Sequence, residues 1–423
     1  MSSPIWHPFT QHALMPEQVF VERAEGAYLY TRDGERIIDA ISSWWINIHG
    51  HNHPKIVAAV QAQAAQMDQI IFAGFTHGPA EELAARLIAL TPPELTRVFF
   101  SDSGSTAVEV GLKMALGVFA NRGRPRKGIV AFEDAYHGDT FGGMSVGGRS
   151  VFNAAYEPML FDVHRLPFPD GDGQATLGAF EHLLKTQGDD IAALIVEPLV
   201  LGAAGMLMYG PEILKGLHDL CRRYGVFFIA DEVMTGWGRT GTRFACDQAG
   251  IAPDILCLSK GLTGGFLPLA VTLATDEIYA AFYSTDRSRT FFHSSSFTGN
   301  PMACAAANAA LSLWDEEPVM ERIDSIHAHQ AVLLKRLAAR PDVRNARHTG
   351  TIMAFDIKSD EHGYLAGIGP KLYRYFIANG VLLRPLGDTL YMLPPYCVSK
   401  EDLDVIAGTI ERALDALQHG ALE

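Results

Sequence analysis

The sequence predicts an α/β protein with a mostly parallel sheet covered by helices on both faces and a second, smaller α+β domain. Helical and strand-like patterns alternate along residues 54–310, as in proteins whose parallel strands are joined by crossover helices. The shorter strand and helix signals of residues 311–423 are expected to combine with residues 1–53 in the smaller domain.

Each predicted element has its own pattern. Apolar residues at helical spacing predict helices at Pro54–Met67, Ala80–Leu90, Thr106–Phe119 and Pro211–Arg223. Short apolar runs predict strands at Arg97–Phe100, Gly128–Phe132, Ala192–Val196, Val226–Ala230, Ile255–Ser259 and Leu269–Leu273. A long helical stretch follows from Pro301 to Arg340, with further strand and helix signals at Gly350–Ile357, Leu372–Ala378, Val381–Arg384 and Leu390–Leu393.

Composition and charge exclude several classes of protein. A chain of 423 residues with 48% hydrophobic and 19% charged residues is expected to be globular. Its longest apolar stretch, Ile191 to Met208, is interrupted by Glu197 and Pro198, so no membrane span is predicted. A net charge of −14 disfavours nucleic acid as a partner.

The five cysteines include no Cys-x-x-Cys pair, which argues against a disulfide framework and a zinc ribbon. The N-terminal sequence has no basic stretch followed by an apolar one, so neither secretion nor import is expected. The expected location is the reducing cytoplasm.

Two predicted strands end in side chains suited to covalent chemistry. Lys260 closes the apolar run Ile255–Ser259 and precedes a glycine-rich turn, and a lysine that loses hydration at a buried strand end becomes a nucleophilic amine. Asp231 follows the strand Val226–Ala230, so both side chains can face one ligand at the carboxyl edge of the sheet. Pyridoxal phosphate (PLP) requires such an amine and such a carboxylate. A structural ion pair is the alternative.

Two further segments supply groups that a phosphorylated heterocycle would need. Residues 101–106, Ser-Asp-Ser-Gly-Ser-Thr, follow a strand and open a helix, where unpaired backbone amides and hydroxyl groups bind anions. An ordinary helix cap is the alternative. Tyr136 follows the strand Gly128–Phe132, and its ring could stack on a flat heterocycle or simply pack in the core.

These motifs, in this order, resemble the class III aminotransferases of PLP fold type I over essentially the whole chain. The motifs are Ser-Asp-Ser-Gly-Ser at 101–105, Tyr-His-Gly at 136–138, Ala-Asp-Glu-Val at 230–233 and Ser-Lys-Gly at 259–261. The resemblance implies a seven-stranded sheet, a small domain built from both termini, and a homodimer whose active sites draw on both subunits.

The resemblance also implies a role for each matching residue. Lys260 would carry the cofactor PLP and move the substrate's proton, and Asp231 would keep the pyridine nitrogen protonated. Gly104 and Ser105 would cradle the phosphate. Tyr136 would stack on the ring and line the substrate site.

A finer resemblance points to the branch of this family that acts in biotin biosynthesis. It rests on Trp-His-Pro-Phe-Thr at 6–10, Ser-Ser-Trp-Trp at 42–45, His-Gly-His-Asn-His-Pro at 49–54 and Arg-Pro-Leu-Gly at 384–387. It implies that Arg384 binds the carboxylate of 8-amino-7-oxononanoate (KAPA), for which a planar guanidinium is well suited, and that Trp44, Trp45 and Tyr391 form the apolar wall. Without it, both tryptophans would be assigned to the core and Arg384 to the surface.

The loop at residues 292–301 matches the segment that reaches the PLP phosphate of the partner subunit. Ser296 takes the place of the family's phosphate-binding threonine, while Ser294 and Ser295 replace a Gly-Pro pair found in some members. Phe9 stands where some members have a substrate-recognising tyrosine. The missing hydroxyl bears on substrate affinity or on the choice of amino donor.

Two features leave alternatives open. Glu197 matches a carboxylate behind the cofactor and could equally be a surface acid. His49, His51 and His53 have a metal-like spacing, but no neighbouring carboxylate or thiolate completes a zinc site, so a structural loop is expected and no metal is predicted.

The expected reaction transfers an amino group to KAPA, with S-adenosylmethionine as donor and lysine as the rival donor. The alternatives are an ω-amino acid:pyruvate aminotransferase, a PLP aminomutase and a non-catalytic α/β binding protein.

Overall fold

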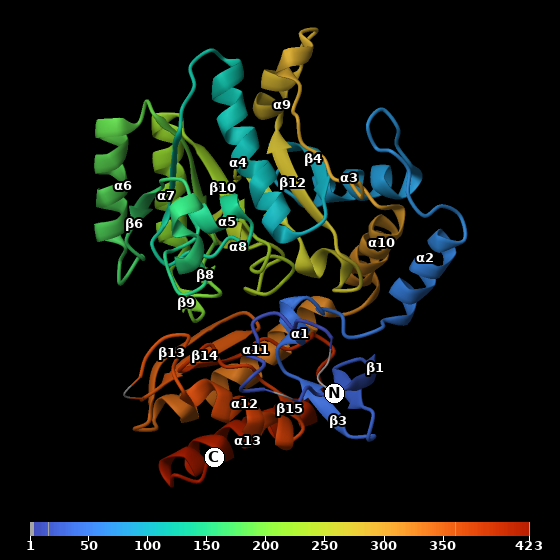
Figure 1. The fold of residues 1–423 in the computed structure, drawn as a ribbon, viewed down its shortest axis with the longest axis vertical. Helices are drawn as coiled ribbons and strands as arrows, with labels where there is room; N and C mark the ends of the chain where they lie inside the picture. Colours follow the sequence, from blue (N-terminus) through green and yellow to red (C-terminus); the bar gives the residue numbers. More distant parts are fainter. Residues whose placement is uncertain (1–3, 16, 360, 423) are drawn as a thin grey trace.

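The computed structural model describes residues 4–15, 17–359 and 361–422. Its centre is a seven-stranded sheet in the order β4-β12-β11-β10-β7-β5-β6 (Figure 1). The strands are β4 (Leu95–Ser101), β5 (Gly128–Phe132), β6 (His164–Leu166), β7 (Ile191–Val196), β10 (Phe227–Asp231), β11 (Ile255–Leu258) and β12 (Ala270–Thr275). Neighbouring strands are parallel except that β12 runs antiparallel to both β11 and β4. The predicted α/β class is confirmed.

Helices cover both faces of this sheet. Ile195 and Ile229 pack into one apolar cluster with residues of α4, whereas Leu194 and Phe228 belong to the cluster that contains the apolar face of α7. All six residues of β7 are buried, which is why the strand reads as a continuous apolar run. The helices of this region are α2 (Pro54–Ala64), α3 (Gly78–Leu90), α4 (Gly104–Asn121), α5 (Phe141–Val146), α6 (Gln174–Gln187), α7 (Pro211–Tyr224), α8 (Ala245–Ala249), α9 (Asp276–Phe282) and α10 (Pro301–Glu316).

A smaller α+β region joins both ends of the chain. It holds a four-stranded sheet in the order β1-β2-β3-β15 and a three-stranded sheet in the order β13-β14-β16, with bounds β1 (Val21–Glu25), β2 (Tyr28–Thr31), β3 (Arg36–Asp39), β13 (Val343–Thr349), β14 (Ile352–Ile357), β15 (Val381–Leu382) and β16 (Thr389–Met392). Because β15 pairs with β3, the N- and C-terminal segments share one sheet, as Figure 1 shows. The domain limits at residues 53 and 310 stay predictions.

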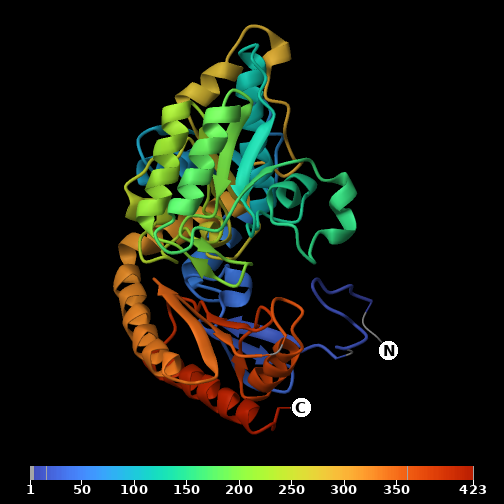
Figure 2. The same ribbon diagram turned by 90° about the vertical axis from the view of Figure 1, so that its left-hand side faces the viewer.

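Its helices are α11 (Val319–Ala338), α12 (Ile368–Ala378) and α13 (Lys400–Gln418). The helical stretch predicted from Pro301 to Arg340 is divided into α10 and α11, and α11 is the long orange helix along one side of the molecule in Figure 2. Pro318 causes the break because a residue before proline avoids helical geometry, and Glu317 accordingly takes extended backbone angles. Two short elements, α1 (Ser42–Trp45) and the hairpin of β8 (Val200–Leu201) and β9 (Leu207–Met208), lie in the connections.

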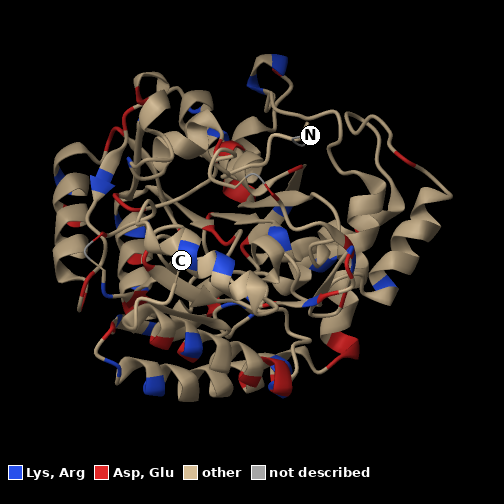
Figure 3. Ribbon diagram, turned by 60° about the horizontal axis from the view of Figure 1, so that its bottom comes forward, with Lys and Arg blue, Asp and Glu red and all other residues tan. Residues whose placement is uncertain are grey.

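Positively and negatively charged residues are interspersed along the ribbon (Figure 3). All five cysteines are free thiols. Within the described ranges, no helix combines the length and apolar character needed to cross a bilayer.

Candidate active site

Ten of the predicted site residues line one cavity of about 450 Å³ at the carboxyl edge of the seven-stranded sheet, next to the smaller region. The cavity collects side chains from the N-terminal segment, the turn after β3, the N-terminus of α4, the ends of β5, β10 and β11, and the C-terminal region. These residues are Phe9, Trp44, Trp45, Gly104, Ser105, Tyr136, Asp231, Lys260, Arg384 and Tyr391.

Lys260 begins the 3-10 turn that follows β11, and its backbone is held in the left-handed region at φ 45°. Such backbone strain gathers at functional sites. Burial lowers the pKa of the Lys260 amine to about 8, with the negative charges of Asp231 and Glu197 partly opposing that shift. The Nζ atom lies 5.0 Å from the centre of the Trp45 ring. A free amine at this position is therefore accessible near neutral pH.

Asp231 ends β10 and is held by two hydrogen bonds. The Nδ1 atom of His137 donates to Oδ2 at 2.7 Å, and the amide of Val233 donates to Oδ1 at 3.2 Å. The other ring nitrogen of His137 is buried and has no partner among the described residues. His137 was not predicted as a site residue, although it sits in the Tyr-His-Gly motif that located Tyr136.

Glu197 lies behind Tyr136 and is buried, so the surface-acid interpretation is wrong. Its carboxylate accepts hydrogen bonds from the amides of Tyr136 at 2.9 Å and Gly202 at 3.0 Å. Burial raises the pKa of Glu197 to about 7, partly opposed by the nearby His137. The carboxylate thus fixes the backbone that carries the Tyr136 ring.

The N-terminus of α4 combines a helix cap with an open anion cradle. Ser103 is the cap, since its hydroxyl accepts the amide hydrogen of Thr106, while Gly104 and Ser105 line the cavity. A Cβ at Gly138 would lie 2.0 Å from Ser105 Oγ, and one at Gly104 would lie 2.6 Å from a methyl group of Val233. These glycines keep the cradle open, and the first amides of the helix can bind a phosphate there.

Aromatic side chains and one arginine form the rest of the wall. Trp45 donates from Nε1 to the Tyr391 hydroxyl at 3.0 Å, and the two rings meet edge to face. Trp44 is partly exposed and packs against Phe9. Arg384 lies 5.4 Å from the Trp44 ring centre and donates to the Phe9 carbonyl at 2.9 Å. Its remaining guanidinium hydrogens leave it able to bind a carboxylate.

Ser294, Ser295 and Ser296 do not line the cavity of their own chain. They form a surface loop before α10 in which Thr298 Oγ1 accepts from the Ser295 amide at 3.0 Å. Lys113 holds the start of this loop by donating to the Phe292 carbonyl at 2.9 Å. The predicted contacts of Ser295 and Ser296 with a partner's cofactor phosphate, and of Ser294 with the substrate, stay predictions.

Two of the three histidines of the 49–53 loop pair with carboxylates. His51 Nε2 lies 2.8 Å from Asp39 Oδ2, and His53 Nε2 lies 2.9 Å from Glu317 Oε1. His49 packs edge to face on Trp314, and neither of its ring nitrogens has a hydrogen-bond partner among the described residues. Burial lowers the pKa of His49 to about 3. Among the described residues, no group of three or more His, Cys, Asp or Glu side chains is placed to hold a metal ion.

The site fits PLP. A buried amine at one strand end, a carboxylate at the next and an amide cradle at a helix N-terminus define a PLP-dependent enzyme of fold type I. The unpartnered His137 nitrogen and the space kept free at Gly104 and Gly138 are consistent with a bound group between them.

The chain belongs to the class III aminotransferase family, whose model matches residues 10–414. It is 50% identical to the adenosylmethionine-8-amino-7-oxononanoate aminotransferase of Synechococcus elongatus, over 98% of this chain and 99% of that relative. The enzyme of the same name from Nitratidesulfovibrio vulgaris is 42% identical, over 99% of this chain and 81% of the relative.

Solved structures agree with this family. The crystal structure of adenosylmethionine-8-amino-7-oxononanoate aminotransferase from Methanocaldococcus jannaschii has a TM-score of 0.94 and 33% identity, with 97% of each chain covered. A PLP-bound amine transaminase from an uncultivated Pseudomonas species has a TM-score of 0.91 and 31% identity, covering 98% of this chain and 99% of that one. The protein is a PLP-dependent aminotransferase.

Proposed function

We propose that the protein transfers an amino group from S-adenosylmethionine to KAPA, giving 7,8-diaminononanoate in biotin biosynthesis. The observation that carries this proposal is the 50% identity, along nearly the full length of both chains, with a relative named for that reaction. The residues of the cavity support this proposal, because they combine several aromatic side chains with one arginine.

PLP, when bound, withdraws electrons from the substrate carbon and holds the amino group between the two half-reactions. Lys260 supplies an amine whose pKa of about 8 allows it to accept and return a proton near neutral pH. Asp231, fixed by His137, offers its carboxylate to a protonated ring nitrogen. Tyr136, with its backbone anchored by Glu197, presents an aromatic face beside the ring.

KAPA has a carboxylate at one end of an apolar chain and an amino ketone at the other. Arg384 would bind that carboxylate through paired hydrogen bonds. Trp44, Trp45 and Tyr391 would pack along the methylene groups and exclude water. Phe9 lies against Trp44 and has no hydroxyl to donate a hydrogen bond. It would therefore recognise the substrate by packing alone.

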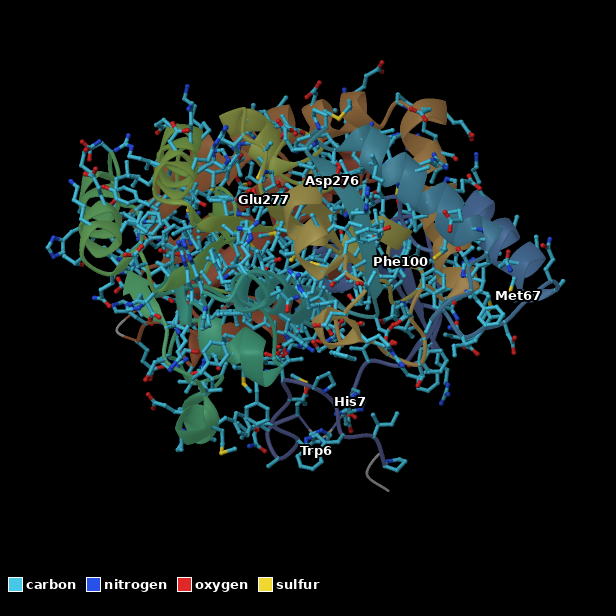
Figure 4. The ribbon with its side chains drawn as sticks, turned by 90° about the horizontal axis from the view of Figure 1, so that it is seen from above. Trp6, His7, Met67, Phe100, Asp276 and Glu277 are labelled. Carbon is cyan, nitrogen blue, oxygen red and sulfur yellow. The ribbon has the colours of Figure 1, made fainter. Side chains whose placement is uncertain are left out.

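We further propose that the protein works as a cytoplasmic homodimer. Large apolar side chains are exposed around the Ser294–Ser296 loop, namely Phe292 (72%), Phe297 (61%), Ile71 (65%) and Phe75 (63%). Gln69 joins the two segments by donating to the Ser296 carbonyl at 3.3 Å. Trp6 is a second exposed apolar residue, on an N-terminal segment at the edge of the molecule (Figure 4). A second copy would cover such surface and bring the serines to its phosphate.

Half-reaction spectroscopy tests the proposed donor and class. The PLP-loaded protein is mixed with one amino donor and no acceptor, and loss of the cofactor's visible absorbance reports transfer of the amino group. S-adenosylmethionine is expected to cause this loss, and KAPA to restore the absorbance. A response to lysine instead identifies the rival donor. A response only to ω-amino acids, reversed by pyruvate, would contradict the proposal.

A further inference from the structure

The turn that carries both tryptophans has an unusual backbone. Ser42, Ser43 and Trp45 have positive φ values of 52°, 58° and 67°, although none of them is glycine. Ser43 also has ψ −94°, close to the rare and strained form of the γ-turn. Such conformations persist only when surrounding contacts hold them, so the presentation of Trp44 and Trp45 requires support from outside the turn.

Asp39 provides that support. It ends β3 and is fully buried. Its Oδ2 atom accepts hydrogen bonds from the Ser43 amide at 2.6 Å and the Ser43 hydroxyl at 3.3 Å, and its Oδ1 atom accepts from the Ile41 amide at 3.2 Å. One carboxylate therefore ties the residues on either side of Ser42 to the end of β3.

His51 also holds the Asp39 carboxylate in place. Its Nε2 atom donates to Asp39 Oδ2 at 2.8 Å, and its Nδ1 atom accepts from the Asn47 side-chain amide at 3.0 Å. The same Asn47 amide lies 3.4 Å from Ser43 Oγ, which closes the network. The middle histidine of the 49–53 loop thus has a role distinct from that of its neighbours.

We propose that Asp39 and His51 are positioning residues for substrate binding, because they hold the Ser42–Trp45 turn in the conformation that places Trp44 and Trp45 along the cavity. This inference rests on the proposed role of the two tryptophans as the substrate wall. The residues expected to contact the cofactor come from other elements, namely α4, the loop after β5, β10 and the turn after β11. Loss of the pair therefore weakens substrate binding and leaves PLP binding intact.

The neighbouring histidine gives a matched comparison. His51→Gln and His53→Gln each replace one carboxylate-bonded histidine of the same loop, but His53 bonds Glu317 at the end of α10 and not the clamp of the Ser42–Trp45 turn. His51→Gln is expected to raise the KM for KAPA on the order of tenfold, as for coupled networks in general, with kcat and the Kd for PLP changed less than about twofold. His53→Gln is expected to change none of the three. Equal effects of the two variants, or a weakened Kd for PLP in His51→Gln, would overturn the inference.

Glycine at position 43 supplies a rescue. Glycine adopts positive φ without a Cβ penalty, so Ser43→Gly reduces the need for the clamp. In the His51→Gln background it is expected to restore the KM toward the wild-type value. The near-UV circular dichroism of the tryptophans is expected to differ from the wild-type spectrum in His51→Gln and to match it in His53→Gln. In the variant that combines His51→Gln with Ser43→Gly, the wild-type spectrum is expected to return.

This spectrum needs no substrate, so it tests the clamp even if KAPA is not turned over. Wild-type turnover of KAPA tests the proposed function separately. An unaltered spectrum in His51→Gln, or no recovery with Ser43→Gly, contradicts the clamp.

Discussion

At the scale of single residues, the chemistry depends on one amine kept in an apolar, enclosed position. Burial disfavours the ammonium form of Lys260 and lowers its pKa from 10.5 to about 8. Burial of this amine raises the free energy of the folded protein, whereas the amine is hydrated in the unfolded chain. Reactivity and stability are therefore opposed at this position.

The pH dependence of stability makes this opposition measurable. The pKa of Lys260 is lower in the folded protein than in the unfolded chain, so the unfolded chain binds more protons between about pH 8 and 10.5. The free energy of unfolding of the wild type therefore rises with pH across that window. PLP-free Lys260→Met is expected to exceed the wild type in free energy of unfolding at pH 7, by up to about 3 kcal/mol. The difference should shrink as the pH rises from 8 to 10.5. Urea unfolding at several pH values measures it, and a difference independent of pH would contradict the predicted shift.

The sequence predicts the positions of Lys260 and Asp231 but not the hydrogen bonds that hold the site together. Lys260 and Asp231 could be placed from the sequence because each ends an apolar strand, which is a local pattern. The bond between His137 and Asp231 joins residues 94 positions apart, and the bond between Asp39 and the Ser43 turn depends on a backbone conformation that no composition rule indicates. Contacts of this kind are decided by tertiary packing.

At the scale of elements, the phosphate cradle depends on two segments meeting without side chains between them. The N-terminus of α4 supplies the amides, and Gly138, at φ 104°, passes directly against Ser105. The motifs for both segments were visible in the sequence, but their distance was not. The antiparallel direction of β12 was likewise not predicted, since an apolar run carries no direction.

Gly138→Ala tests the close approach. Its Cβ would lie 2.0 Å from Ser105 Oγ, so Ser105 must move and the affinity for PLP is expected to fall on the order of tenfold or more, as for strained backbone in general. Gly123→Ala is the matched control, because Gly123 also has a positive φ but its added Cβ would meet no atom within 4 Å. Titration of PLP-free protein measures both Kd values. Equal losses in the two variants would show that backbone strain alone, and not the cradle, is responsible.

At the scale of the whole molecule, the arrangement of the two regions explains the shared site. The large sheet provides the strand ends and the cradle, while the small region adds the tryptophans, Arg384 and Tyr391 from segments near opposite ends of the chain. The sequence predicted this architecture from alternation in the middle and weaker signals at both ends. In a single chain the Ser294–Ser296 loop does not line the cavity, so the proposed dimer would complete the site.

A charged substitution in the exposed apolar surface tests whether that surface forms the dimer interface. Phe297→Asp places a carboxylate beside the serine loop and is expected to shift the sedimentation profile from dimer toward monomer and to weaken PLP binding with it, because a buried unpaired charge is costly. Tyr283→Asp is the control, since Tyr283 is also exposed (76%) but follows α9 and is not part of the serine loop. A Phe297→Asp protein that remains dimeric with full PLP affinity would exclude this surface as the interface.

The most direct measurement of the central claim is borohydride reduction of the PLP-loaded protein followed by peptide mapping. The cofactor is expected to be fixed to the peptide that contains Lys260, and the Lys260→Ala protein is expected to yield no labelled peptide. Labelling of a different lysine, or labelling that survives Lys260→Ala, would contradict the assignment of Lys260 as the residue that carries PLP.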